Sequence, residues 1–112
     1  MKTLYRNATN RILFKLHEDP AQFSGAAVLF RQGGRIVLKK EKGDFTVEAG
    51  TDRDGSGCWF VSFLLTPWES RQLDPFHLCF AQIVVLRASG VQDPGEIIEF
   101  EVCDTLADVS FR

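Results

Sequence analysis

The sequence predicts an all-β protein, an antiparallel β-sandwich of about seven strands with one short helical turn. Short runs of alternating apolar and polar residues recur at hairpin-like spacing and are separated by glycine, proline and aspartate, which is the pattern of strands joined by tight turns. No helical pattern is longer than the turn at residues 66–73. A sandwich of immunoglobulin-like architecture accounts for both observations, and a β-barrel is the alternative.

The length of the chain fits one hydrophobic core. A chain of 112 residues that is 45% apolar is long enough to bury a single core and too short for two. We therefore expect one domain over residues 1–112, with an N-terminal extension at residues 1–10 and a tail at residues 104–112 outside its strands.

Four strands are expected in the first half of the chain. In the first of them, "RILFKLHE", Ile12, Phe14 and Leu16 alternate with polar residues except at Leu13, as in a half-buried strand. Gly33 and Gly34 favour a tight hairpin between the second and third strands, because glycine tolerates positive φ. The four segments are residues 11–18, 24–32, 35–40 and 44–50.

Two later segments are apolar on both faces, "CWFVSFLL" and "LCFAQIVVL". Such runs are typical of central strands, which the opposite sheet covers on one side and which loops, turns or a neighbouring subunit cover on the other. The last strand, "IIEFEV", alternates again. These three segments are residues 58–65, 78–86 and 97–102.

The stretch "TPWESRQL" between the two apolar runs predicts the start of a helix. Thr66 suits the N-cap, Pro67 suits the first helical position, and Glu69 completes a capping box with Thr66. We expect this turn to carry the chain from one sheet to the other, with Trp68 and Leu73 closing the end of the core.

Composition and charge argue against several partners and compartments. The net charge of −2 offers no attraction for nucleic acid or an anionic membrane. The longest stretch without formal charge, residues 55–68, is shorter than the roughly 20 residues of a membrane-spanning helix, and the N-terminus lacks the apolar segment of a secretory signal. Cys58, Cys79 and Cys103 suit buried free thiols of a reducing compartment, so we expect a cytoplasmic protein.

The loop "TDRDGSG" resembles the first half of a calcium-binding loop. Asp52, Asp54 and Ser56 stand at its first, third and fifth positions. The glutamate expected at the twelfth position is replaced by Phe63, and aspartate and glycine are also common in ordinary β-turns. We interpret the loop as a turn, with these three residues as weak candidates for an ion site, and we expect no cofactor.

Other polar clusters give little support for catalysis. His77 and Cys79 would share one side of a strand and could supply two zinc ligands, but no spaced partners follow. His17, Glu18 and Asp19 gather at a strand end without a convergent second element. No nucleophile elbow, phosphate-binding glycine loop or metalloprotease motif is present, so we expect a protein that is not an enzyme.

Large aromatic residues are the best candidates for an interface. The chain holds ten Phe and two Trp, and a small sandwich has difficulty burying all of them. An exposed apolar patch marks a contact surface in many proteins, whereas the alternative is that all of these side chains belong to the core. The interface candidates are Trp59, Trp68, Phe76 and Phe111.

The order of motifs over most of the chain resembles the N-terminal immunoglobulin-like domains of upper-baseplate and related tail proteins in phages and prophages of Gram-positive bacteria. The matching pieces are a first strand that ends in an acidic loop, the segment "FSGAAVLFRQ", a hairpin, and an Asp/Gly turn into an apolar strand. The segments "LLTPWESRQL", "FAQIVVLRASG" and "IIEFEVCDTL" follow in the same order. The pair "LTPWESRQL" and "FAQIVVLRASG" is the most specific part.

The resemblance implies a structural role without catalysis. It places Thr66, Glu69 and Leu73 in the helical corner of that family and Gln82 at its central-strand glutamine. It implies partners that are other phage tail proteins or copies of the same chain, a possible homo-oligomer, and a protein that leaves the cytoplasm of its producer as part of the virion.

The chain departs from the family by ending soon after the sandwich, whereas many baseplate proteins continue into a fibre or carrier region. A free-standing virion component or an assembly factor is therefore an alternative to the baseplate role. The alternative function is a carbohydrate-binding module in which Trp59 or Trp68 forms a flat platform for a sugar ring.

Overall fold

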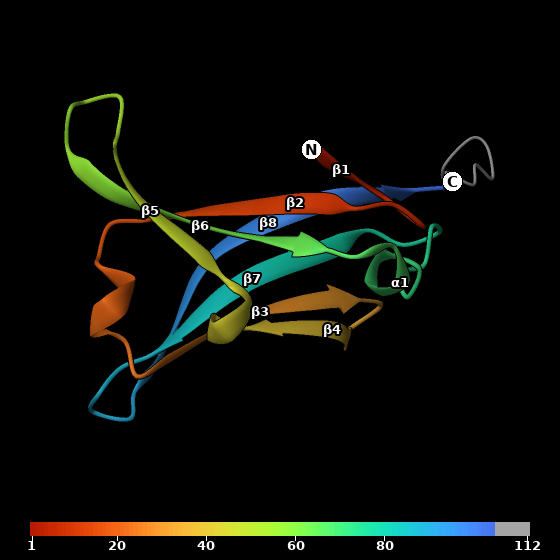
Figure 1. Ribbon diagram of the computed structural model, residues 1–112. Helices are drawn as coiled ribbons and strands as arrows, with labels where there is room; N and C mark the ends of the chain where they lie inside the picture. The colour runs from red at the N-terminus through yellow and green to blue at the C-terminus, as the bar shows by residue number, and fades with distance from the viewer. Residues whose placement is uncertain (105–112) are drawn as a thin grey trace.

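Two β-sheets packed face to face form the computed structural model, which describes residues 1–104 (Figure 1). The five-stranded sheet has the order β1-β8-β7-β3-β4, and the three-stranded sheet has the order β2-β6-β5. The predicted all-β sandwich is confirmed. The strands and the helix are β1 (Lys2–Tyr5), β2 (Asn10–Leu16), β3 (Gly25–Gln32), β4 (Arg35–Glu41), β5 (Thr46–Thr51), β6 (Gly57–Leu65), α1 (Pro67–Ser70), β7 (Cys79–Leu86) and β8 (Gln92–Cys103), with single 3-10 turns η1 (Pro20–Gln22) and η2 (Lys42–Asp44).

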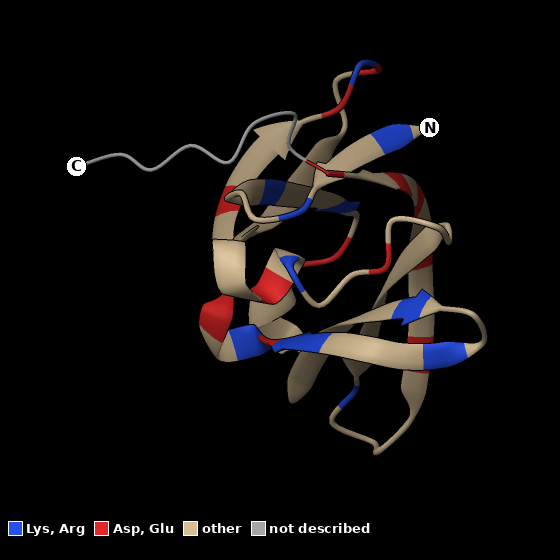
Figure 2. Ribbon diagram, turned by 90° about the vertical axis from the view of Figure 1, so that its right-hand side faces the viewer, with Lys and Arg blue, Asp and Glu red and all other residues tan. Residues whose placement is uncertain are grey.

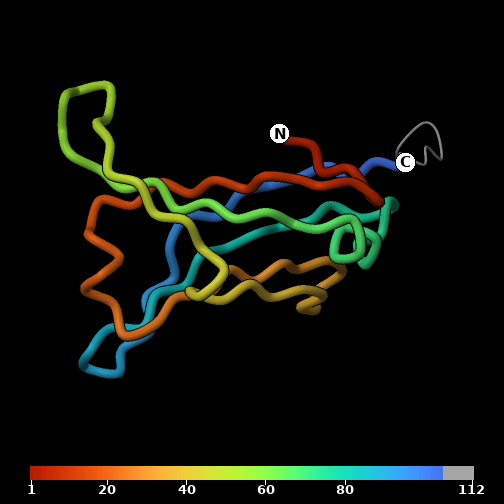
Figure 3. The backbone as a smooth tube through the Cα atoms, in the orientation of Figure 1, coloured from red at the N-terminus to blue at the C-terminus, as the bar shows by residue number. Residues whose placement is uncertain are grey.

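An eighth strand lies where the sequence predicts an extension. In residues 1–10, β1 runs parallel to β8 and places Leu4 opposite Val102, so the sandwich is antiparallel except for this pair. The side chain of Asn10 ties β1 to the start of β2, because it accepts a hydrogen bond from the Tyr5 amide (3.0 Å) and donates one to the Tyr5 carbonyl (2.8 Å). Figure 3 traces β1 beside the end of β8. The prediction missed this strand because only Leu4 in it is buried.

The last strand begins earlier than predicted. β8 starts at Gln92, and its pairing with β7 shifts register between Gln82 and Val84. At this bulge a Cβ on Gly95 would lie 2.9 Å from Ile83 Cγ2, so the two strands approach closely only because residue 95 has no side chain. The proline and glycine that read as a loop in the sequence are therefore part of a bulged strand.

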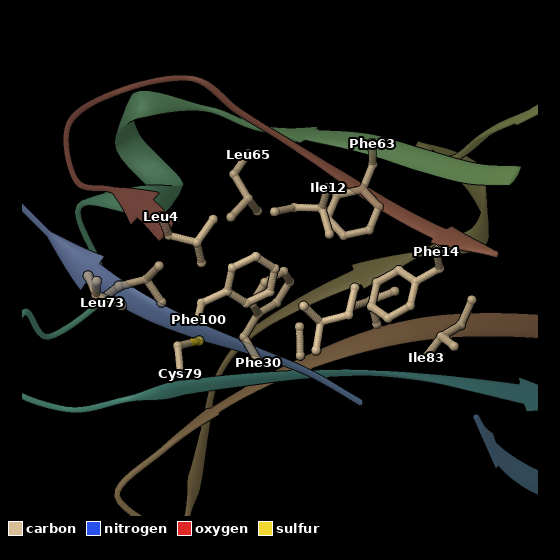
Figure 4. Close-up of a cluster of buried hydrophobic side chains, with 14 of the residues drawn as sticks. Leu4, Ile12, Phe14, Phe30, Phe63, Leu65, Leu73, Cys79, Ile83 and Phe100 are labelled. Atoms are coloured by element: carbon tan, nitrogen blue, oxygen red, sulfur yellow. The ribbon is translucent and has the colours of Figure 1, made fainter. Parts of the chain in front are cut away.

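The core fills the space between the two sheets (Figure 4). The ring of Phe63 from β6 meets Phe30 of β3 edge to face, with centroids 6.1 Å apart, and stacks on Phe45 at 5.4 Å. Figure 4 shows Leu4 and Leu73 near one end of this cluster and Phe14 near the other. Aromatic pairs of this kind stabilise a sandwich beyond the area they bury.

The helical corner joins β6 of one sheet to β7 of the other, as predicted. Thr66 Oγ1 accepts a hydrogen bond from the Glu69 amide (3.1 Å), and Glu69 Oε1 accepts one from the Thr66 amide (3.0 Å), which completes the capping box. Leu73 is buried in the core, but Trp68 is 67% exposed, so its predicted place in the core is wrong. Ser70 is the buried residue of α1, and a residue two positions earlier on a helix points to the opposite side.

Within residues 1–104, α1 and the 3-10 turns are too short to cross a membrane.

Candidate interaction surface

The face of the five-stranded sheet that points away from β2, β5 and β6 is the main candidate for a contact surface; we call it the outer face. On β3 and β7 it carries every second residue, because the intervening residues point into the core. Strand pairing arranges these residues in four rows across the sheet. From β4 to β8 the rows are Ile36, Arg31, Phe80, Glu99; then Lys39, Leu29, Gln82, Ile97; then Glu41, Ala27, Val84, Pro94; and finally Gly25, Leu86 and Gln92 on β3, β7 and β8.

Three large apolar side chains of the outer face are exposed. Ile36, Phe80 and Ile97 are 51%, 40% and 57% exposed, although β7 and β8 are interior strands of the sheet. Sandwich sheets that face water on one side normally alternate apolar and polar residues, with the polar ones on the solvent side. The outer face departs from that rule, because no loop or turn among residues 1–104 removes these three side chains from solvent.

The outer face has a large hollow at one end and an exposed aromatic ring at the other. A hollow of about 500 Å³ lies over the second to fourth rows, where Gly25 and Ala27 leave room between Leu29, Val84 and Leu86. The ring of Phe80 stands in the first row, at the opposite end of the same face. The surface therefore offers both an exposed aromatic ring and a mainly apolar depression.

The four rows carry charges of both signs, at Arg31, Lys39, Glu41 and Glu99. Lys39 Nζ lies 3.3 Å from Glu41 Oε1, and both side chains are more than half exposed, so this ion pair contributes little to the stability of one molecule. Gln82, the residue that the resemblance singles out, lies in the second row and donates a hydrogen bond to the Gly95 carbonyl (3.2 Å). Figure 2 shows basic and acidic residues distributed over the whole ribbon.

The predicted interface candidates do not form one patch. Trp68 and Phe76 are 67% and 90% exposed at the α1 end of the molecule, whereas Trp59 is half-buried near the opposite end of β6. The guanidinium carbon of Arg71 lies 5.4 Å from the ring centroid of Trp68 and covers one of its faces. Phe111 lies outside the described residues.

The loop of Asp52, Asp54 and Ser56 has the hydrogen bonds of an ordinary turn. Asp52 Oδ1 accepts from Lys15 Nζ (3.0 Å) and from the Arg53 amide (2.8 Å), and the hydrogen bond from Lys15 is the main reason that the pKa of Asp52 is lowered. Asp54 Oδ1 accepts from the Ser56 amide (2.9 Å), which lowers the pKa of Asp54. Across residues 1–104, no three His, Cys, Asp or Glu side chains converge in a metal-binding arrangement.

His77 and Cys79 are separated. His77 Nδ1 lies 3.0 Å from Asp74 Oδ2 in an exposed turn, whereas Cys79 is fully buried, and burial raises the pKa of its thiol to about 11. The alternation that would place both on one side begins only at Cys79, the first residue of β7.

The acidic strand end at Glu18 and Asp19 has structural partners. Both carboxylate oxygens of Glu18 accept hydrogen bonds from Arg87 (2.8 and 2.9 Å), which lowers the pKa of Glu18. Asp19 Oδ1 accepts from the Ala21 amide (2.9 Å) and caps η1. These contacts join the loop after β2 to the end of β7, where Arg87 also pairs with Asp93 of β8, so the guanidinium holds the carboxylates of both Glu18 and Asp93.

An ion pair fastens the helical corner to the hairpin. Lys40 Nζ of β4 lies 2.9 and 2.8 Å from the two carboxylate oxygens of Glu69. Partial burial opposes the charge of Glu69, but the hydrogen bonds from Lys40 and the Thr66 amide outweigh it and lower the pKa of Glu69. Thr66, Glu69 and Leu73 are thus structural residues of the corner.

In comparisons with known proteins, no family model and no curated protein matches this chain.

Proposed function

We propose that this chain is a non-enzymatic structural component that acts through protein–protein contacts, with the outer face as its contact surface. The exposed apolar residues of that face, Ile36, Phe80 and Ile97, carry the proposal. An apolar face on interior strands costs free energy in water and favours a surface that another protein covers.

The particle that we propose is a phage or prophage tail, in a baseplate-like position. The support is the order of motifs, above all "LTPWESRQL" at the corner followed by "FAQIVVLRASG" on β7. The partners are then neighbouring tail proteins or further copies of the chain, and the protein becomes virion-associated after synthesis in the cytoplasm.

Fractionation of released particles tests this role. In the organism that encodes the chain, particles are released by induction, banded on a density gradient and probed with an antibody against the purified protein. We expect the protein to band with intact tails in a fixed ratio to the other tail proteins. Its recovery only among unassembled proteins would contradict the proposal.

A pair of charge substitutions tests the contact surface. Phe80→Lys places a charge in the first row of the outer face, and Leu64→Lys places the same charge at a residue of β6 that is also exposed but lies on the other sheet. We expect Phe80→Lys to reduce incorporation into particles at least about tenfold, while Leu64→Lys is incorporated normally. Circular dichroism and thermal unfolding check that both variants fold.

The exposed ring of Trp68 favours the second candidate, a carbohydrate-binding module. Arg71 covers one face of that ring, which leaves the other face for stacking on a sugar. A glycan array with the native protein and Trp68→Ala tests it: binding that disappears in the variant supports a sugar site, and no binding by either protein excludes it for the glycans printed.

A further inference from the structure

We propose that the outer face binds the outer face of a second copy of this chain, about a two-fold axis that lies in the plane of the interface and runs across the strands. This inference rests on the proposed function, because it names the partner of the same contact surface. Three properties of the face carry it: the register of its rows, its shape and the positions of its charges.

The register decides which rows meet. An axis across the strands, between the second and third rows, reverses the direction of the strands in the second copy. The first row then lies over the fourth row of the second copy, and the second row lies over its third row. Two sheets stacked face to face pack about 10 Å apart with their strands nearly aligned, so residues in facing rows touch.

The shape of the face fits this arrangement. The ring of Phe80 in the first row lies over Leu86 and Gly25 in the fourth row of the second copy, which border the hollow of about 500 Å³. Because the contact is symmetric, the ring of the second copy enters the hollow of the first. An aromatic ring in an apolar pocket is the usual core of a protein interface.

The charges and the flanking apolar residues also match. Lys39 in the second row meets Glu41 in the third row of the second copy, and Glu41 meets Lys39 in return. On the other side of the sheet, Ile97 of the second row meets Pro94 of the third. In these two rows the axis therefore joins opposite charges on β4 and apolar residues on β8.

A two-fold axis along the strands does not give these favourable contacts. It would exchange β4 with β8 and place Lys39 against Ile97 and Ile36 against Glu99 of the second copy. Those contacts place Lys39 and Glu99 against apolar side chains and bring them no opposite charge from the second copy, which is unfavourable.

The area of the outer face determines how strong a dimer we expect. Four strands and four rows span roughly 19 by 25 Å, which is about 500 Å² for each copy and less than the roughly 800 Å² of a standard interface. We therefore expect a weak dimer with a dissociation constant in the micromolar range. Repetition of the contact in a particle would strengthen it through avidity.

Sedimentation velocity on the full chain, from about 5 to about 500 µM, measures the dimer. We expect a concentration-dependent dimer, and we expect Phe80→Ala to weaken it at least about tenfold. The matched control is Leu64→Ala, which removes an exposed apolar side chain of the other sheet and leaves the dimer unchanged. A protein that stays monomeric at the highest concentration, or a dimer that Phe80→Ala leaves intact, overturns the inference.

Charge reversal tests the axis itself. Lys39→Glu and Glu41→Lys each place two like-charged contacts in the symmetric dimer, so each variant alone is expected to dimerise about tenfold more weakly. An equal mixture of the two variants forms heterodimers in which both contacts are attractive, and it recovers the dimer. Arg53→Glu, in the exposed loop far from the face, is the control for net charge. A mixture that behaves like the single variants overturns the axis.

The particle assay separates this inference from the proposed function. If the inference alone fails, the protein is monomeric in solution, yet particle incorporation still depends on Phe80. If the proposed function fails, the protein is absent from particles whether or not it dimerises.

Discussion

Leu73 closes the α1 end of the core with a side chain that is only 1% exposed. Its replacement by alanine leaves a cavity between the sheets, and we expect Leu73→Ala to lower the free energy of unfolding by about 2 to 4 kcal/mol. Urea unfolding followed by circular dichroism measures the change. Leu78→Ala, a few residues later and partly exposed, should cost less than about 1 kcal/mol, and equal losses for both would show that Leu73 has no special place in the core.

The contribution of Glu69 to the stability of the fold depends on pH. Partial burial opposes its charge, but the hydrogen bonds from Lys40 and Thr66 lower its pKa in the folded protein. The ionised carboxylate therefore stabilises the fold at pH values above the ordinary glutamate pKa, and this contribution is lost as the pH falls through the lowered value. We expect Glu69→Gln to be less stable than the native protein at pH 7, with the difference shrinking below about pH 4.

Unfolding of both proteins over a series of pH values measures that difference. Glu48→Gln, at an exposed position of β5, is the control and should follow the native protein throughout. A difference between Glu69→Gln and the native protein that is constant from pH 7 to about pH 3 would mean that the ion pair with Lys40 does not stabilise the corner.

At the scale of elements, the hairpin between β3 and β4 depends on the backbone conformation of its turn. Gly33 and Gly34 have φ values of 58° and 80°, as both central residues of a type I′ turn require. We expect Gly33→Asn to be nearly neutral, because asparagine adopts this conformation readily, and Gly33→Val to cost about 1 to 2 kcal/mol. A Cβ at residue 33 would have no neighbour within 4 Å, so thermal unfolding of the pair reports mainly the backbone effect, and equal stability of the two variants would contradict it.

Most strands could be predicted because their signals are local. Alternation in β2 and β3, the two-glycine turn and the capping box at Thr66 each lie within a few residues of sequence. β1 could not be predicted, because a four-residue strand with one buried side chain carries almost no pattern and owes its place to pairing with β8 at the far end of the chain. The start of β8 could not be predicted because Pro94 and Gly95 are typical of loops. In the structure they belong to the strand, at a bulge in its pairing with β7.

The outer face could be predicted only in part. Apolar runs with no polar side, in β6 and β7, already indicate that something must cover both faces of those strands. Which residues stand together depends on register: Ile36, Phe80 and Ile97 come from three strands, and their neighbours in each row are set by pairings over long sequence separations. Aromatic residues such as Trp68 and Phe76 attract notice in the sequence but lie apart from that face.

At the scale of the whole molecule, the two sheets share one core, so we expect them to unfold together. Cys79 reports on this directly, because it is fully buried and burial raises the pKa of its thiol to about 11. At pH 8 we expect a thiol reagent to modify Cys79 only at the rate of global unfolding, whereas the partly exposed Cys103 reacts sooner. Mass spectrometry of digested samples measures both rates, with urea-unfolded protein as the control.

Equal rates for Cys79 and Cys103 under native conditions would show that the sheets separate locally without unfolding of the whole domain.

The two tryptophans lie at opposite ends of β6, Trp59 near its start and Trp68 in α1 beyond its end, and this separation has an optical consequence. Trp68 projects into water beside Arg71, while Trp59 is half-enclosed near the other end of the strand. Their emission spectra should differ, with the indole of Trp68 emitting at longer wavelength and accessible to an ionic quencher such as iodide, and that of Trp59 shielded from it. Tryptophan fluorescence, measured with and without the quencher, can therefore monitor the two ends of this molecule independently.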